Sequence, residues 1–560
     1  MIGYICKYTP VEIFEAFGEE VKRLEPDVAG FNQADTLMHP NLCSFAKGIV
    51  ETALEEPLDG IVLTTCCDSI RRVYDVLKEK LPDTFVYILD LPHITKTAGV
   101  QLYEQRVREM IAAYEAFCGK VFDEQAFCEI LKRGTQKKEE AYGTPKIGIL
   151  GARANPAIRR ILTEHQAGIA FDLTCTGSAR RLVLQEEQPL FGYVDGLLGQ
   201  FPCMRMEAAA NRDQMIQKYA DTADGIIYHT VQFCDQYSYE YAWLKETLHR
   251  PMLLLETDYT RQSHGQILTR LEAFLESLHT ADAAKKSRGR QRVMQNTKTG
   301  DGRMYVLGID SGSTSTNAVI MDQNREITAF SIVRTGAKAG ESAQRVLADV
   351  LQKAGLKQEQ LSWIVSTGYG RVSIPFADET VTEISCHGKG AHYFNPAVRT
   401  ILDIGGQDSK SIRLDEKGEV VDFVMNDKCA AGTGRFLEAI ARTLEVDISE
   451  LGPIALQSRE TIAITSMCTV FAESEVISLI ANNKEKADIA NGVCHAIASK
   501  SYSMMRRVGL EPEVMMTGGV ARNPGVVHAV EENIQGKLYI CPQPDLVGAV
   551  GAAVYALSKL

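Results

Sequence analysis

The sequence contains no long apolar run, no excess of basic residues and no pair of cysteines separated by two residues. Its longest apolar stretches, such as Ile61–Leu63 and Met252–Leu255, fall far short of the roughly 20 residues that cross a bilayer. A formal net charge of −12 argues against a nucleic-acid partner, since phosphate contacts need a basic surface. The first residues also lack the pattern of a secretory signal. We therefore expect no membrane span and a cytoplasmic location.

The missing Cys-x-x-Cys spacing argues against zinc ribbons and ferredoxin loops, so any metal must collect its ligands from distant segments. The sequence nevertheless contains 14 cysteines. Disulfides rarely persist in a cytoplasmic chain, and metal binding or catalysis is the better explanation for so many thiols. A single cysteine is at least as often a small buried hydrophobe, so only cysteines within a wider motif are candidates.

The length of 560 residues exceeds what one hydrophobic core organises and predicts several lobes. Residues 279–303 are rich in Lys and Arg and nearly free of large apolar side chains, which favours a solvated basic linker. Before this linker, apolar runs alternate with helical patterns in two rounds. This rhythm predicts two parallel-sheet, flavodoxin-like lobes at residues 1–144 and 145–278. In such sheets, loops at the carboxyl ends of the strands line the ligand crevice.

After the linker, the pattern changes to short strands joined by tight turns. Two groups of three strands are predicted, each followed by helices: Tyr305–Asp310, Asn317–Asp322 and Ile327–Val333, then Thr400–Ile404, Ser409–Leu414 and Val420–Met425. Because the second group repeats the first, we expect a duplicated α/β architecture over residues 304–560.

Three glycine turns in this half have the composition of phosphate-binding loops. They span residues 310–316, 403–410 and 516–523, and the first two begin with an aspartate at a strand end. Glycine lets backbone N–H groups approach a phosphate, hydroxyls add donors, and an aspartate can hold Mg²⁺ or its waters. One such turn is weak evidence because most glycine turns are only turns, but three in this order are much stronger.

Around these loops the sequence resembles the acetate and sugar kinase, Hsc70 and actin (ASKHA) superfamily, in which ATP lies between two duplicated lobes. More narrowly, residues 403–410, 426–436 and 468–475 resemble the activators of 2-hydroxyacyl-CoA dehydratases and the related reductases of benzoyl-CoA type. This resemblance covers essentially the whole of the C-terminal half. It implies an actin- and Hsc70-like ATPase domain over residues 304–560.

The resemblance also implies roles for individual side chains in an ATP and Mg²⁺ site. Asp310 and Asp403 are expected to organise Mg²⁺ and the attacking water, and Gln407 to position the water or the γ-phosphate. The expected ATP contacts are Ser311, Gly312, Ser313, Thr314, Gly405, Gly406, Lys410, Gly432, Gly434, Gly518, Gly519 and Asn523.

Cys429 and Cys468 each precede a helical pattern, at residues 434–444 and 470–481. The positive end of a helix favours the thiolate, which is the form that iron binds. One subunit offers only two such ligands, whereas a two-fold dimer offers the four that a [4Fe–4S] cluster needs. The resemblance implies this arrangement, a homodimer with one bridging [4Fe–4S] cluster. The alternative is a pair of buried structural cysteines.

Four cysteine motifs before the linker resemble the cluster-binding subunits of 2-hydroxyacyl-CoA dehydratases and the double-cubane cluster proteins. They are Tyr4–Glu12, His39–Phe45, Thr65–Arg72 and Gln232–Tyr241. The resemblance implies an [8Fe–9S] double cubane, or a single [4Fe–4S] cluster. The expected ligands are Cys6, Cys43, Cys67, Cys175, Cys203 and Cys234, with Cys66 as the alternative to its neighbour Cys67.

Together these features predict a homodimeric, ATP-dependent iron–sulfur reductase. ATP hydrolysis would drive electrons from the bridging cluster to the N-terminal cluster, which reduces a small-molecule substrate or activates 2-hydroxyacyl-CoA dehydration. A ferredoxin or flavodoxin is the expected electron donor. The chain departs from the dehydratases in having one cluster-binding unit instead of two unlike subunits, which puts an acyl-CoA substrate in doubt. Two alternatives are a small-molecule kinase of the same superfamily and an ATP-dependent cluster-assembly or chaperone module.

Overall fold

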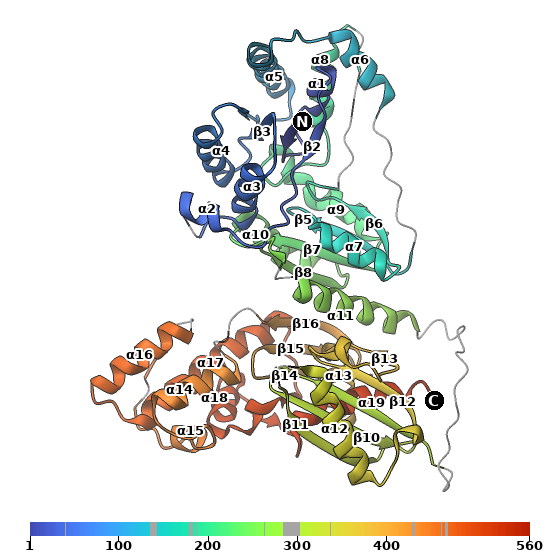
Figure 1. The fold of residues 1–560 in the computed structure, drawn as a ribbon, viewed down its shortest axis with the longest axis vertical. Coiled ribbons are helices and arrows are strands. Elements are labelled where there is room, and N and C mark those ends of the chain that lie inside the picture. The colour runs from blue at the N-terminus through green and yellow to red at the C-terminus, as the bar shows by residue number, and fades with distance from the viewer. Residues whose placement is uncertain are drawn as a thin grey trace. The chain divides into compact units, whose positions relative to one another are not determined.

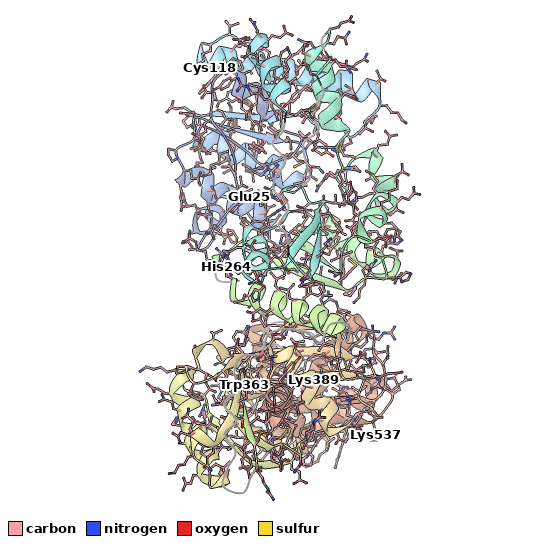
Figure 2. All side chains as sticks on the ribbon, turned by 90° about the vertical axis from the view of Figure 1, so that its right-hand side faces the viewer. Glu25, Cys118, His264, Trp363, Lys389 and Lys537 are labelled. Atoms are coloured by element: carbon pink, nitrogen blue, oxygen red, sulfur yellow. The ribbon has the colours of Figure 1, made fainter. Side chains whose placement is uncertain are left out.

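The computed structural model describes residues 1–39, 41–134, 143–177, 182, 184–185, 187–261, 264–283, 303–336, 338–427, 430, 432–460, 462–464 and 469–560. These residues form two compact units, Met1–Phe274 and Leu275–Leu560 (Figure 1). Figure 2 shows the side chains of the same units. In this described part of the chain, no helix combines the length and the apolar character that a bilayer crossing needs.

The first unit contains two four-stranded sheets in which every neighbouring pair of strands is parallel. One sheet has the order β2-β1-β3-β4 and the other β6-β5-β7-β8, so both have the same topology. The strands are β1 (Ile2–Tyr4), β2 (Val21–Arg23), β3 (Gly60–Thr64), β4 (Phe85–Leu89), β5 (Lys146–Gly151), β6 (Gly168–Asp172), β7 (Gly225–Val231) and β8 (Met252–Thr257). The prediction of two parallel-sheet lobes is confirmed. Their similarity to flavodoxin and the boundary between residues 144 and 145 stay predictions.

Helices connect these strands, as parallel pairing requires. They are α1 (Val11–Ala16), α2 (Asn32–Leu37), α3 (Ser44–Glu55), α4 (Asp68–Lys80), α5 (Thr97–Cys118), α6 (Glu124–Arg133), α7 (Pro156–Glu164), α8 (Pro189–Leu198), α9 (Arg212–Ala220) and α10 (Asp235–Thr247). One continuous hydrophobic core includes Ile61 and Tyr103 from the first lobe and Tyr193 and Tyr228 from the second, all fully buried. The two lobes therefore pack on a shared core.

Helix α11 (His264–Ala283) extends past residue 279, where the linker was expected to begin. The first residues of the predicted linker are therefore helical. Residues 284–302, the rest of that segment, lie outside the described residues. The basic tether between the two halves stays a prediction for those residues.

The second unit contains two five-stranded sheets, with the orders β11-β10-β9-β12-β13 and β16-β15-β14-β17-β18. In each sheet the first three strands form an antiparallel meander and the others pair in parallel. The strands are β9 (Tyr305–Ser311), β10 (Ser315–Asp322), β11 (Ile327–Arg334), β12 (Leu361–Thr367), β13 (Glu379–Thr380), β14 (Thr400–Ile404), β15 (Ser409–Leu414), β16 (Val420–Asn426), β17 (Val514–Thr517) and β18 (Leu538–Tyr539). The predicted duplicated α/β architecture is confirmed.

The helices of the second unit follow the meanders, as the sequence pattern predicted. They are α12 (Ala339–Ala354), α13 (Glu383–Phe394), α14 (Gly434–Thr443), α15 (Ile448–Ala455), α16 (Thr469–Ala481), α17 (Lys486–Val508), α18 (Pro524–Ile534) and α19 (Val547–Leu557). In both meanders the last residue but one of the first strand is an aspartate, Asp310 in β9 and Asp403 in β14, because each lobe repeats the same strand-and-turn unit. The duplication therefore brings two phosphate-type loops to equivalent places in the two lobes.

Candidate functional site

The second unit contains a pocket of about 670 Å³ that is lined by residues of both duplicated lobes. Most of the predicted nucleotide residues lie in its wall: Asp310, Gly312, Ser313, Thr314, Asp403, Gly405, Gly406, Lys410, Gly434, Gly518, Gly519 and Asn523. Ser311, Gln407 and Gly432 lie outside this lining. Ser311 is fully buried at the end of β9. Gln407 is exposed, and its amide oxygen accepts a hydrogen bond from Arg435 Nη2 at 2.8 Å.

Asp403, near the end of β14, is the centre of a buried polar cluster in this pocket. The Thr517 hydroxyl donates to its Oδ1 at 2.8 Å, and His387 Nε2 lies 3.3 Å from the same oxygen. Lys410 Nζ lies 3.3 Å from Oδ2. Burial alone would raise the pKa of Asp403, but the neighbouring His387 and Lys410 hold that pKa well below its usual value. Asp403 is therefore an ionised carboxylate with a fixed orientation.

His387 reaches this cluster from α13, and the sequence analysis did not identify it. Its Nδ1 lies 2.8 Å from the carbonyl oxygen of Glu383, which can only accept, so Nδ1 carries a proton and Nε2 faces Asp403. Burial lowers the pKa of His387, but the Asp403 carboxylate outweighs this and raises it to about 9. The imidazole is therefore a cation at neutral pH. The sequence feature that could have identified His387 is its i, i+4 spacing from Glu383, which places both residues on one helix face.

Lys410 is a second buried cation in the pocket. Its Nζ lies 2.7 Å from Asp408 Oδ2 and 3.5 Å from Glu383 Oε1, in addition to its contact with Asp403. Burial raises the pKa of Glu383 to about 7, although Lys410 favours the ionised form. In this part of the pocket wall the carboxylates outnumber the cations. Such an oxygen-rich wall suits a hard divalent cation such as Mg²⁺.

Asp310, at the end of β9, faces the pocket from the other lobe and is nearly buried. Two glycines make room for its carboxylate. A Cβ on Gly368 would lie 2.5 Å from Oδ1, and one on Gly548 would lie 2.3 Å from Oδ2. Gly368 also has a φ of +84°, which side chains other than glycine rarely adopt. Burial raises the pKa of Asp310, and among the described residues it makes no ion pair.

The phosphate-type loop after β14 is bonded directly to the start of α14. Gly434 N–H donates to the Gly405 carbonyl and Arg435 N–H to the Gly406 carbonyl, both at 2.9 Å. Helix α14 packs on α16, where the Thr443 hydroxyl lies 3.2 Å from Glu473 Oε1. The pocket is thus connected to both helices that follow the predicted bridging cysteines.

The bridging ligands themselves, Cys429 and Cys468, lie outside the described residues. The helices predicted after them are present, at α14 and α16. The bridging cluster and the homodimer stay predictions.

The first unit contains a cavity of about 100 Å³ whose wall includes every predicted N-terminal cysteine: Cys6, Cys43, Cys66, Cys67, Cys175, Cys203 and Cys234. We call it the cysteine cavity. Three of these residues occupy the N-cap positions of helices, Cys43 on α3, Cys67 on α4 and Cys234 on α10. A helix N-terminus favours the thiolate form. The strand-to-helix turns after β3 and β7 bring Cys67 and Cys234 to the carboxyl ends of their sheets, where parallel sheets bind ligands.

The thiols of the cysteine cavity contact one another in two groups. Hydrogen bonding by the Cys66 thiol lowers the pKa of Cys6 to about 6 and that of Cys67 to about 7. The bonds that it makes to these two thiols raise the pKa of Cys66 itself. In the second group, Cys175 bonds to Cys203 and lowers the pKa of Cys203. The arrangement places thiols that share protons side by side, and Cys66 stays the alternative to Cys67 as a candidate ligand.

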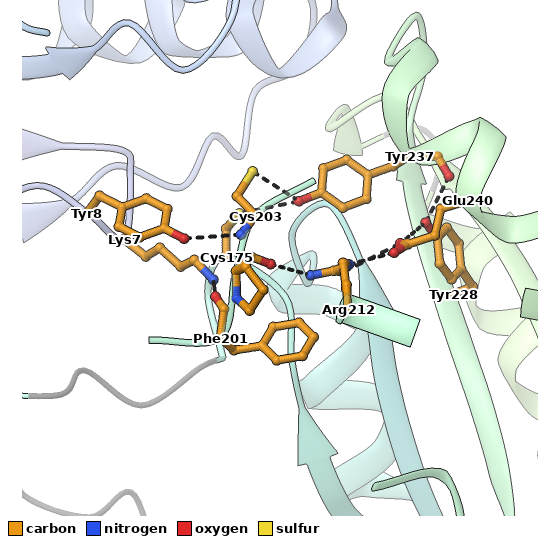
Figure 3. A network of polar contacts seen from close by, with 10 residues as sticks. Lys7, Tyr8, Cys175, Phe201, Cys203, Arg212, Tyr228, Tyr237 and Glu240 are labelled. Carbon is orange, nitrogen blue, oxygen red and sulfur yellow. Dashed lines mark hydrogen bonds and ion pairs between the residues drawn. The ribbon is translucent and has the colours of Figure 1, made fainter. Parts of the chain in front are cut away.

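Buried cations surround the second group of thiols (Figure 3). Arg212 pairs with Glu240, with Nε 2.5 Å from Oε1, and Lys7 Nζ donates to the Phe201 carbonyl at 2.5 Å. Lys7 and Arg212 are 1% and 2% exposed. Charges this deep are costly unless they face other charges or hydrogen bonds. Lys7 and Arg212 therefore suit a cavity whose thiols become anionic, because each cation can face a thiolate.

Among the described residues, no three His, Cys, Asp or Glu side chains are placed to hold a single metal ion. The seven thiols instead surround one cavity, and this donor set suits a polynuclear iron–sulfur group better than one ion. Soft thiolate ligands also exclude Mg²⁺ and Ca²⁺ from this cavity. The iron–sulfur content of the cavity stays a prediction.

Comparisons with known proteins divide the chain at the same place as the fold does. The profile of the BadF/BadG/BcrA/BcrD ATPase family matches residues 307–556. The profile of the 2-hydroxyglutaryl-CoA dehydratase D-component matches residues 6–142 and 125–278.

Individual relatives agree with the ATPase match. The activator of lactoyl-CoA dehydratase from Anaerotignum propionicum is 49% identical over 253 residues, which are 45% of this chain and 97% of that protein. The (R)-2-hydroxyglutaryl-CoA dehydratase activating ATPase from Acidaminococcus fermentans is 45% identical over 257 residues, 46% of this chain and 98% of that protein. The structure of the activator of 2-hydroxyisocaproyl-CoA dehydratase from Clostridium difficile, with bound ADPNP, is 44% identical and covers 46% of this chain and 95% of that one, with a TM-score of 0.44. The chain therefore belongs to the BadF/BadG/BcrA/BcrD ATPase family of dehydratase activators and fuses this ATPase to a dehydratase D-component-like domain.

Proposed function

We propose that this protein is an ATP-dependent iron–sulfur reductase in which ATP hydrolysis in residues 304–560 drives low-potential electrons toward the cysteine cavity. One observation carries the proposal: a chain of an ATPase family also contains a cavity lined by seven thiols from distant segments. A small-molecule kinase has no need for such a cavity. The reduced cavity would then act on a small-molecule substrate or activate 2-hydroxyacyl-CoA dehydration, as the names of the relatives suggest for those proteins.

In the nucleotide pocket, the oxygen-rich wall is proposed to hold ATP with Mg²⁺, whose charge offsets that of the phosphates. Asp403, ionised and held by His387, Lys410 and Thr517, orients Mg²⁺ waters or the attacking water. Asp310 faces the same space from the other lobe. Asp310 and Asp403 lie on opposite lobes and face the same phosphates. Loss of the γ-phosphate therefore changes the charge between them and can change the separation of the lobes.

The hydrogen bonds between the loop after β14 and helix α14 can transmit a movement of the lobes to that helix. Loop residues Gly405 and Gly406 are bonded to the first residues of α14, and α14 packs on α16. We propose that hydrolysis shifts these two helices together. Cys429 and Cys468, just before them, would hold one [4Fe–4S] cluster between the two subunits of a homodimer, and this cluster would pass electrons onward when bound.

In the first unit, Cys6, Cys43, Cys67, Cys175, Cys203 and Cys234, with Cys66 as the alternative to Cys67, are proposed to hold an [8Fe–9S] double cubane or a [4Fe–4S] cluster. Lys7 and Arg212 would offset part of the negative charge that the thiolates bring into the cavity. The parallel strand order of both lobes supports a flavodoxin-like architecture for residues 1–144 and 145–278. A ferredoxin or flavodoxin is the proposed donor, and the cytoplasm the proposed location.

The test is anaerobic purification of the full chain, followed by iron analysis and electron paramagnetic resonance with and without Mg-ATP. We expect iron in both halves, and a signal from the N-terminal group that changes only when Mg-ATP is added to the dithionite-reduced protein. An iron-free protein that still hydrolyses ATP would refute the proposal and favour a kinase. Equal reduction with a non-hydrolysable nucleotide would refute the coupling to hydrolysis alone.

A further inference from the structure

Helix α10 and the residue before it place a thiol and a phenol at the cysteine cavity, with a carboxylate behind them. Cys234, Tyr237 and Glu240 follow one another at three-residue spacing, which places them on the same side of a helix. Cys234 and Tyr237 line the cavity, while Glu240 is buried behind it. Tyr237 is only 4% exposed, so its hydroxyl must find its partners inside the protein.

The Tyr237 hydroxyl lies beside two further candidate ligands (Figure 3). Its oxygen is 3.6 Å from Cys203 Sγ and 3.9 Å from Cys175 Sγ. A cysteine that binds iron has lost its proton, so its sulfur can only accept a hydrogen bond. A phenol keeps its proton at neutral pH and has one to give. With the cavity filled, the hydroxyl therefore donates to a ligand sulfur, and Cys203 is the nearer one.

The ring of Tyr237 is held in this position from behind. The Tyr228 hydroxyl lies 2.8 Å from the Tyr237 carbonyl oxygen and 2.6 Å from Glu240 Oε2. Arg212 pairs with Glu240, and its guanidinium carbon lies 5.8 Å from the centre of the Tyr237 ring. These groups are buried, so the network has few alternative arrangements.

The same network holds the backbone at Cys203. Arg212 Nη1 donates to the Pro202 carbonyl at 2.6 Å, and the Cys203 N–H donates to the Tyr8 hydroxyl at 3.1 Å. Figure 3 shows these bonds on both sides of the thiol. These bonds fix the backbone from which the Cys203 side chain projects, so the sulfur can leave the Tyr237 hydroxyl only by rotation about the Cα–Cβ bond.

We propose that Tyr237 is a positioning residue that donates a hydrogen bond to the Cys203 thiolate and makes the reduction potential of the group in the cysteine cavity less negative. A hydrogen bond to a ligand sulfur withdraws electron density from it and stabilises the reduced, more negatively charged state. The inference rests on the proposed function, because it requires an iron–sulfur group in the cavity. It adds a tuning residue that is not itself a ligand.

The experiment uses the full chain in a Cys429→Ser background, which removes the signal of the bridging site. Three proteins are titrated with redox mediators and followed by electron paramagnetic resonance: the parent, Tyr237→Phe and the control Tyr193→Phe. Tyr193 is equally buried, and its hydroxyl donates to Glu12 at 2.5 Å instead of a cysteine. We expect the same iron content in all three, a more negative midpoint potential in Tyr237→Phe and an unchanged midpoint in Tyr193→Phe.

A second measurement keeps the test decisive if Tyr237→Phe loads no iron. After exchange of the parent into heavy water, pulsed resonance should detect a deuteron strongly coupled to the cluster, and the absence of such a deuteron overturns the inference. Where the variant does load iron, an unchanged midpoint together with an unchanged deuteron coupling also overturns it, while the proposed function stands. A parent protein without iron overturns the proposed function itself, and the inference with it.

Discussion

The two candidate sites of this chain both contain buried cations, but they differ in the charge of their side chains before a ligand binds. In the nucleotide pocket, Lys410 and His387 already face carboxylates, with Asp403 ionised at the centre. Binding of a divalent cation and phosphates completes a charge network that already exists. This pocket is organised by ion pairs between oxygen and nitrogen, the chemistry that phosphoryl transfer uses.

The cysteine cavity, in contrast, is lined by thiols that must lose protons before they can bind iron. Two arginines at or near the cavity already face carboxylates, Arg153 with Glu25 and Arg212 with Glu240, and they offset only part of the charge of new thiolates. Metal binding there would release protons, whereas nucleotide binding needs little change of protonation. The comparison teaches that the cysteine cavity depends on what is bound there, whereas the nucleotide pocket depends on charges that are fixed in advance.

The largest expected effect comes from removing the central charge of the nucleotide pocket. Asp403→Asn should lower ATP hydrolysis by at least about 100-fold and destabilise the second unit by about 3 kcal/mol, because it leaves the buried His387 cation without its carboxylate. Asp310→Asn should lower hydrolysis about as much but leave stability nearly unchanged, since Asp310 makes no ion pair among the described residues. Steady-state hydrolysis and thermal unfolding check this pair. Equal stability losses in both variants would contradict the assigned difference.

The matching change in the cysteine cavity should act on metal content and spare the ATPase. Cys203→Ser should lose most of the N-terminal iron, because a hydroxyl is a poor ligand for iron in these clusters. Cys118→Ser is the control, since Cys118 lies on α5 outside the cavity lining (Figure 2). Iron analysis and ATP hydrolysis are measured on both proteins. Retention of all iron by Cys203→Ser would remove Cys203 from the ligand set.

Fixed charges in the nucleotide pocket also predict a pH dependence of stability. The folded-state pKa of His387 is raised to about 9 from an ordinary value of 6.5, so its contribution is complete below pH 6.5 and is lost as pH rises toward 9. Glu383, raised to about 7, acts in the same direction between pH 4.5 and 7.

The second unit should therefore lose on the order of 2–3 kcal/mol between pH 6.5 and 9. His387→Gln should flatten this part of the profile, as measured by chemical unfolding at a series of pH values. A profile of the same slope in His387→Gln would show that another group titrates there.

The smallest expected effect tests the space around Asp310. Gly548→Ala places a Cβ 2.3 Å from Oδ2 of Asp310, so the carboxylate must shift by a fraction of an ångström. We expect hydrolysis to fall about 10-fold, because misplaced catalytic groups lose orientation before they lose binding. Gly265→Ala is a matched control, since a Cβ there meets no atom within 4 Å. Parent-like hydrolysis in Gly548→Ala would mean that Asp310 tolerates displacement.

Local patterns in the sequence determined the strands and loops of the ATPase half. Thr400–Ile404 and Ser409–Leu414 are predicted residue for residue, because alternating apolar residues and a glycine turn specify a hairpin over short range. The cysteine candidates from the sequence likewise include every thiol of the cavity, and Cys6, Cys67 and Cys234 lie at strand-to-helix turns.

Only the tertiary structure decided which of these groups meet. Glu383 and His387 join Asp403 because α13 packs beside β14, a contact that no local pattern encodes. Tyr237 reaches the thiols of Cys175 and Cys203 because α10 and two loops far apart in sequence meet at one cavity. Hydrogen bonds and pKa shifts depend on distances of a few ångströms across space, whereas a sequence pattern reports only neighbours along the chain.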